Sequence, residues 1–318
     1  MRVPTFGPTL EDFCVAGRTN HQLLGNLASS ERDGVNDLSV WPSFNHFLLD
    51  FNEQDTHGPT SNLEIFCYTV VDWSMSTAPT ATSVNLLCVH CAVREATTAD
   101  HIPPKGLYAP PRPSDLLTVP SCEECNGGAS MDDEYMRTVL TLKERACDHP
   151  DAKTQVNATM RSLRRNRITG FGRAFLKTVK PVNVTTPAGL ILRKALSYEV
   201  SFERLEPVVV RIVKGLYWHH EHARIGPEYT VGALFEDGLH DLESETRQQL
   251  NETIVRPLLQ APLRSTPRNV LRYRYVVARG DEPISAWLFE FYGDVQCLAL
   301  VTPQSADGKD VSFIRLDR

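Results

Sequence analysis

Two Cys-x-x-Cys pairs constrain this chain more than any other feature of its sequence. Cys88 and Cys91 form the first pair, and Cys122 and Cys125 form the second. Each pair can form a turn that directs two thiolates at one ion, and four thiolates match a closed tetrahedral Zn²⁺ site of the structural type. Cysteine pairs at this spacing are typical of zinc sites. The sequence therefore predicts a structural Zn²⁺ bound by these four cysteines.

The bulk composition is that of a soluble globular protein. The 318 residues are enough for about two domains. The formal net charge is −6, so an anionic partner has to be met by a local basic patch. The apolar runs are too short for a membrane span, and the N-terminus lacks the pattern of a signal peptide. We therefore expect a cytoplasmic protein without membrane contact, in which paired cysteines bind metal rather than form disulfides.

The chain is expected to belong to the α+β class, with three regions. Residues 1–83 are predicted to be an N-terminal extension or small subdomain, and residues 84–182 hold the cysteine pairs and a basic helical segment. Residues 183–318 are predicted to form a C-terminal α+β domain with an antiparallel sheet. Its expected elements are helices over residues 202–222 and 241–259 and strands over residues 270–278, 284–292 and 295–301. The Gly293-Asp294 connection is short enough for a hairpin between the last two strands.

Three polar residues stand between and beside the cysteine pairs in a chemically useful pattern. The order strand, loop, strand, helix is expected here, and it places Asp100, His101 and Asn126 at converging ends of these elements. Asp100 and Asn126 offer the oxygen ligands that a hard divalent cation such as Mg²⁺ prefers. A neutral imidazole at His101 can take a proton from an attacking water molecule. A metal ion that polarises the phosphoryl oxygen completes the parts needed for phosphodiester hydrolysis.

The same residues carry a resemblance to a known family. The run Cys88-x-x-Cys91, Asp100-His101-Ile102-x-Pro104 and Cys122-x-x-Cys125-Asn126 resembles HNH endonucleases of the ββα-metal class with a four-cysteine zinc frame. The segments DHIPPK and VPSCEECN are also similar to a group of bacterial HNH-like proteins. The resemblance covers the central part of the chain only. It implies a zinc-stabilised, treble-clef-like ββα-metal module that hydrolyses nucleic acid, with DNA as the expected substrate.

The family's roles fall on matching positions of this chain, with one departure. The resemblance implies that His101 is the general base and that Asp100 and Asn126 bind the catalytic Mg²⁺ or Mn²⁺. HNH proteins usually carry a further Asn that orients the catalytic His, and Leu117 stands at that position here. Ser114 and Asp115, slightly earlier in the chain, are the polar neighbours that can substitute. Without such a substitute, His101 lacks its orienting partner.

A basic stretch follows the cysteine segment and is the best candidate for contact with nucleic acid. The sequence has no acidic residue between Arg161 and Lys180. Clustered cations of this kind can neutralise backbone phosphates and give salt-sensitive affinity. The alternative is a solvated helical face, or one that pairs with the acidic remainder of the chain. The candidate phosphate-binding residues are Lys105, Arg161, Arg164, Arg165, Arg167, Arg173 and Lys177.

Two other functions remain open on the sequence. The central segment is also consistent with a non-catalytic zinc module that binds nucleic acid or protein, with Asp100 and His101 kept for structural reasons. Alternatively, the C-terminal domain is the functional centre and senses a ligand or protein that controls the nuclease. A homodimer or a regulatory protein partner fits either arrangement.

Overall fold

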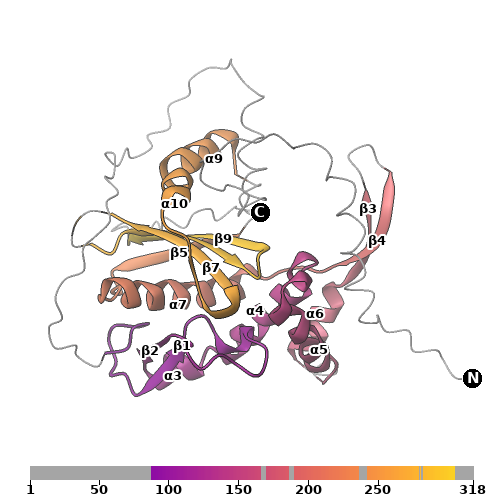
Figure 1. Ribbon diagram of the computed structural model, residues 1–318, viewed down its shortest axis with the longest axis horizontal. Coiled ribbons are helices and arrows are strands. Elements are labelled where there is room, and N and C mark those ends of the chain that lie inside the picture. Colours follow the sequence, from indigo (N-terminus) through magenta and orange to yellow (C-terminus); the bar gives the residue numbers. More distant parts are fainter. Residues whose placement is uncertain are drawn as a thin grey trace, which may run out of the picture.

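The computed structural model describes residues 87–165, 170–185, 190–235, 242–278, 280 and 282–304. The predicted N-terminal extension, residues 1–83, and the candidate Arg167 lie outside these ranges. Within them the chain combines helices with antiparallel sheets, so the α+β class predicted from the sequence is confirmed. Figure 1 shows the arrangement of the elements. No helix in the described ranges is long and apolar enough to cross a membrane.

A short antiparallel hairpin carries the centre of the cysteine segment. Strand β1 (Thr98–His101) pairs with β2 (Thr118–Ser121), and Asp100 lies opposite Val119 in the register. Helix α3 (Glu123–Gly127) begins directly after β2, and α4 (Ser130–Leu142) follows it. The order strand, loop, strand, helix expected for this segment is therefore present.

Two further helices and a β-ribbon follow α4. Helix α5 (Pro150–Arg165) packs against α4, where the hydroxyl groups of Thr141 and Thr159 are hydrogen-bonded at 3.0 Å. Helix α6 (Phe171–Thr178) comes next. Strands β3 (Lys180–Thr185) and β4 (Ile191–Ser197) then form a separate two-stranded antiparallel sheet. Figure 1 shows this ribbon projecting from the side of the molecule at which α5 and α6 lie.

The last third of the described chain forms a five-stranded antiparallel sheet in the order β5-β9-β8-β7-β6. A connection of three residues, Tyr292 to Asp294, joins β8 to β9, with Gly293 at a φ of 73°, and the predicted hairpin is confirmed. The strands are β5 (Tyr229–Phe235), β6 (Arg264–Ser265), β7 (Leu271–Val277), β8 (Ser285–Phe291) and β9 (Val295–Pro303). Alternate residues of each strand face opposite sides of the sheet, so β8 and β9 each contribute to two hydrophobic clusters.

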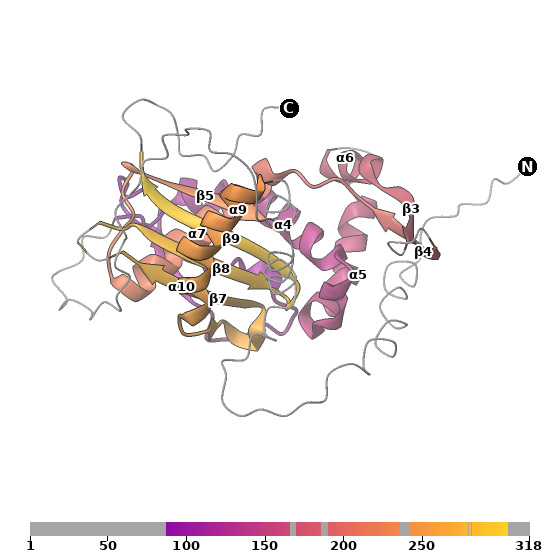
Figure 2. The same ribbon diagram turned by 90° about the horizontal axis from the view of Figure 1, so that it is seen from above.

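Helices cover both faces of this sheet. Helix α7 (Phe202–Glu221) packs against one face, as the apolar stripe over residues 202–222 predicts. The helix predicted over residues 241–259 is present on the other face as three consecutive pieces (Figures 1 and 2). They are α9 (Ser244–Leu250), a π-helical turn (Asn251–Val255) and α10 (Arg256–Gln260).

Helix α7 also packs against the cysteine segment on its other side (Figure 1). A single hydrophobic cluster contains Val89 and Ile102 from that segment together with Trp287 and Phe289 from the sheet. The approach is close, because a Cβ atom added at Gly215 of α7 would lie 2.5 Å from Cγ1 of Ile102. Residues on both sides of the predicted boundary at 182–183 thus share one core, and α7 forms its middle layer.

Candidate metal centre and catalytic site

The four cysteines of the two Cys-x-x-Cys pairs meet at one point. Their sulfur atoms all lie within 4.8 Å of one another, and among the described residues they form a group that could hold a metal ion. Cys88 and Cys91 lie in the turn before β1, while Cys122 caps α3 and Cys125 lies in its first turn. Four converging sulfurs are the ligand set of a structural Zn²⁺ site. The structure therefore brings together all four predicted zinc ligands in an arrangement suited to a metal such as zinc.

An arginine that the sequence analysis did not single out lies against the sulfur atoms. Arg94 donates from Nε to Sγ of Cys122 at 3.3 Å and from Nη2 to Sγ of Cys125 at 3.5 Å. Burial acts to raise the pKa of the Cys122 thiol, but hydrogen bonds from the Cys125 backbone and from Arg94 lower it to about 6. This thiol is therefore biased toward the thiolate form that binds metal.

Asp100 is buried near the end of β1 and is held by His90, 10 residues earlier in the chain, and by Arg211, 111 residues later. Nε and Nη2 of Arg211, on α7, donate to its Oδ2 at 3.2 and 2.7 Å, and Nε2 of His90 donates to the same oxygen at 2.9 Å. Arg211 also donates to Oδ1 of Asp133, on α4, at 2.8 Å. Burial acts to raise the pKa of Asp100, but the His90 hydrogen bond and the charge of Arg211 outweigh it and lower the pKa. All of these hydrogen bonds end on Oδ2 of Asp100, and none of them involves its Oδ1 atom.

His101 faces the opposite side of the strand from Asp100, because adjacent strand residues alternate. Its side chain is partly exposed and has no hydrogen-bond partner among the described residues. Burial lowers the pKa of His101 below the ordinary 6.5, and the positive charges of Lys105 and Arg112 lower it further, against the effect of Asp100. The imidazole is thus neutral at neutral pH and lies in positively charged surroundings.

Asn126 lies beside β1, as the predicted convergence requires. Its Nδ2 donates to Oγ1 of Thr98 at 3.1 Å and to the carbonyl of Ala99 at 3.3 Å. These bonds fix the amide with the nitrogen toward the strand. The Oδ1 atom accepts no hydrogen bond from the described residues and can serve as an oxygen ligand.

Leu117 supports the strand end through its backbone. Its carbonyl accepts a hydrogen bond from the Ile102 amide at 2.9 Å, and its side chain packs against the core. Ser114 and Asp115 are exposed, and within the described ranges neither is hydrogen-bonded to His101. In this arrangement neither polar neighbour takes the place of the usual orienting Asn.

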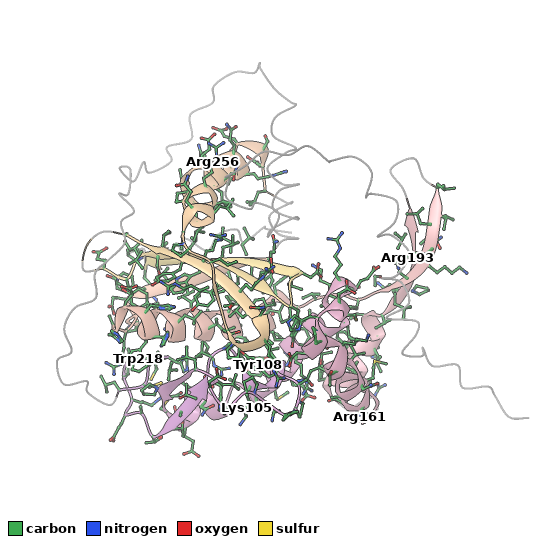
Figure 3. All side chains as sticks on the ribbon, in the orientation of Figure 1. Lys105, Tyr108, Arg161, Arg193, Trp218 and Arg256 are labelled. Atoms are coloured by element: carbon green, nitrogen blue, oxygen red, sulfur yellow. The ribbon has the colours of Figure 1, made fainter. Side chains whose placement is uncertain are left out.

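The candidate phosphate-binding residues that the structure describes lie on α5, on α6 and in the loop between β1 and β2. Arg161, Arg173 and Lys177 are exposed, Arg164 and Arg165 end α5, and Lys105 is exposed just after the Asp-His pair. Gln155 of α5 donates to the carbonyls of Gly106 and Tyr108 at 2.7 and 2.9 Å, which ties the helix to the segment after His101. Figure 3 shows Lys105 and Arg161 on the same side of the molecule, away from the five-stranded sheet.

Comparison of the chain with protein-family models, curated proteins and solved structures gives no significant match.

Proposed function

We propose that this protein is a metal-dependent endonuclease of the HNH type, built on a zinc-stabilised ββα-metal module, with DNA as its substrate. One observation carries the proposal. The hairpin that the four cysteines close has His101 at the end of one strand and Asn126 hydrogen-bonded to that same strand, at 3.3 Å from the Ala99 carbonyl. A candidate base and a candidate metal ligand thus share one rigid frame, which catalysis requires.

The surroundings of His101 suit a general base that acts on a phosphodiester. Its lowered pKa keeps the imidazole in the neutral form that accepts a proton from water. The charges of Lys105 and Arg112, which lower that pKa, also attract a phosphate group. Arg112 is anchored there by a hydrogen bond of 3.0 Å from Nε to the Lys105 carbonyl.

Oxygen atoms for a catalytic Mg²⁺ or Mn²⁺ are present at Asp100 and Asn126. The contacts of Asp100 converge on Oδ2, so Oδ1 is the atom that would bind the ion, oriented by Arg211 and His90. Such hydrogen bonds to a ligating carboxylate are usual around metal sites. When bound, the ion would supply charge stabilisation to the phosphoryl group and the leaving oxygen. We include both residues in the proposed site.

Replacing His101 by alanine tests the proposal. We expect the wild type to nick or linearise supercoiled plasmid with Mg²⁺ or Mn²⁺, and His101→Ala to be slower by about 10²- to 10⁴-fold, the usual contribution of a general base. The zinc content of both proteins is measured first. His222→Ala, at an exposed histidine just after α7, is the matched control and should cleave like the wild type. Equal cleavage by His101→Ala and the wild type would contradict the proposal.

The pH dependence of cleavage provides a second prediction. A base must be deprotonated to act, so cleavage should fall as the pH drops through the pKa of His101, with a midpoint below 6.5. Lys105→Gln removes a charge that lowers this pKa, and the midpoint should move to higher pH. Lys177→Gln, on α6, serves as the control and should leave it in place. An unshifted midpoint in Lys105→Gln would argue against His101 as the titrating group.

The second candidate is a non-catalytic zinc module that binds nucleic acid. The observation that favours it is the guanidinium of Arg211 at 2.7 Å from Asp100, because a positive charge there opposes the binding of another cation. Salt-sensitive DNA binding by the zinc-loaded wild type, without cleavage at any Mg²⁺ or Mn²⁺ concentration, would favour this candidate over the nuclease.

A further inference from the structure

The charge of the four-cysteine centre requires compensation. Zinc is bound by thiolates, so a Zn²⁺ ion with four cysteine ligands carries about two excess negative charges. The centre is partly withdrawn from water, because Cys88 and Cys122 are buried. Uncompensated charge in such a place is unfavourable, and the structure supplies two cations next to it.

The first cation is Arg94, three residues after the first cysteine pair. Its Nε and Nη2 atoms donate to Cys122 and Cys125, and its backbone amide donates to Sγ of Cys91 at 3.5 Å. One residue therefore contacts three of the four sulfurs and joins the first cysteine pair to the second. Arg94 also forms an ion pair with Glu124, which holds the guanidinium against α3.

The second cation is Lys214, which comes from α7. Its Nζ donates to the carbonyl of His90, inside the first Cys-x-x-Cys turn, at 2.9 Å. His90 stands between Cys88 and Cys91, so this hydrogen bond places the ammonium group beside the first cysteine pair, on the helix that packs between the cysteine segment and the sheet.

We propose that Arg94 and Lys214 are the counter-cations of the four-cysteine metal centre, and that they retain the metal and protect its thiolates from reaction. Lys214 makes helix α7, in the C-terminal part of the chain, a component of the centre. The inference rests on metal binding by the four cysteines and is independent of nuclease activity.

Four variants of the whole chain test this role. Arg94→Gln and Lys214→Gln remove a positive charge, and Arg94→Lys and Lys214→Arg keep it. The zinc-loaded proteins are mixed with a colorimetric chelator, and the rate of zinc release is followed; iodoacetamide labelling of the cysteines is followed by mass spectrometry. Removal of a contact outside the ligand shell typically weakens metal binding by about 10- to 100-fold, so Arg94→Gln and Lys214→Gln should release zinc faster by about this factor. The thiolates should be alkylated faster in proportion.

The conservative variants separate charge from packing. Lys214→Arg keeps the positive charge and should release zinc like the wild type, and Arg94→Lys should fall between the wild type and Arg94→Gln. Arg173→Gln, at an exposed site on α6, controls for a general loss of positive charge. Far-UV circular dichroism verifies that each variant is folded. Release within about twofold of the wild type in both Gln variants would overturn the proposal. Wild-type protein that binds no zinc would also overturn it, whatever the plasmid assay shows.

Discussion

Serine in place of Cys122 is expected to abolish metal binding and to unfold the cysteine segment. Cys122 is buried, it caps α3, and its sulfur lies within 4.8 Å of the other three. Structural Zn²⁺ contributes about 10–16 kcal/mol of apparent binding free energy in zinc-finger peptides, and this energy is folding energy. A whole domain is stable by only about 5–15 kcal/mol, so the loss of the metal is large enough to decide whether this segment folds.

The measurement is zinc per chain by atomic absorption, together with thermal unfolding before and after treatment with a strong chelator. We expect about one zinc per wild-type chain and a marked fall of Tm in Cys122→Ser and in the chelated wild type. Cys147→Ser is the matched control, because Cys147 is partly buried but is not one of the four clustered cysteines. A Cys122→Ser protein that keeps its zinc and its Tm would exclude the cysteine centre as a structural site.

The parts of this structure that sequence could predict are those in which local spacing determines the geometry. A Cys-x-x-Cys turn directs both sulfurs to one side, so the convergence of the four cysteines follows from two short motifs. The stripe of apolar residues every three to four positions likewise predicted α7 within one residue of its observed end at Glu221. The short connection at Gly293-Asp294 predicted the β8–β9 hairpin, which is again a local feature of the sequence.

The partners of Asp100 could not be predicted in this way. Arg211 lies 111 residues away from it, and periodicity shows which face of a helix is buried but not what that face contacts. One signal was present in the sequence: Arg211 interrupts the otherwise apolar stripe of α7, between Val208 and Ile212. A charged residue on a buried stripe needs a partner of opposite charge, but the sequence does not show which acidic residue that partner is.

The alternation of side chains along β1 also limits how Asp100 and His101 can converge on one site, and this limit could be predicted from the sequence. Asp100 and His101 are adjacent on β1, so their side chains must leave opposite faces. The structure accordingly buries Asp100 toward α7 and leaves His101 partly exposed beside Lys105. The convergence of Asp100, His101 and Asn126 is thus a convergence of backbone elements, and the two faces of β1 carry different groups.

Arg211→Ala is expected to destabilise the protein by about 3–5 kcal/mol, the usual result of removing one partner from a buried ion pair. The Arg211 side chain is 11% exposed and serves both Asp100, at 6%, and Asp133, at 25%. Its loss leaves two largely buried carboxylates without a positive charge. It also removes the ion pairs that connect α7 with β1 and α4. Urea denaturation followed by circular dichroism measures the change, and the midpoint should fall without a change of slope. Arg256→Ala, at an exposed residue of α10, should alter stability by no more than about 0.5 kcal/mol.

The pH dependence of this effect distinguishes charge from packing. The pKa of Asp100 is lowered in the folded protein, so the ion pair adds stability above the unfolded pKa near 3.8, and this contribution is lost as the pH falls through the lower folded value. The difference between the wild type and Arg211→Ala should therefore be largest near neutral pH and should shrink in acid. Arg211→Met keeps much of the side-chain volume and should lose nearly as much stability at neutral pH, because the buried Asp100 carboxylate still lacks its cation. A loss below about 1 kcal/mol in both variants, or one that does not depend on pH, would mean that the Arg211 contacts are not what fixes Asp100 against α7.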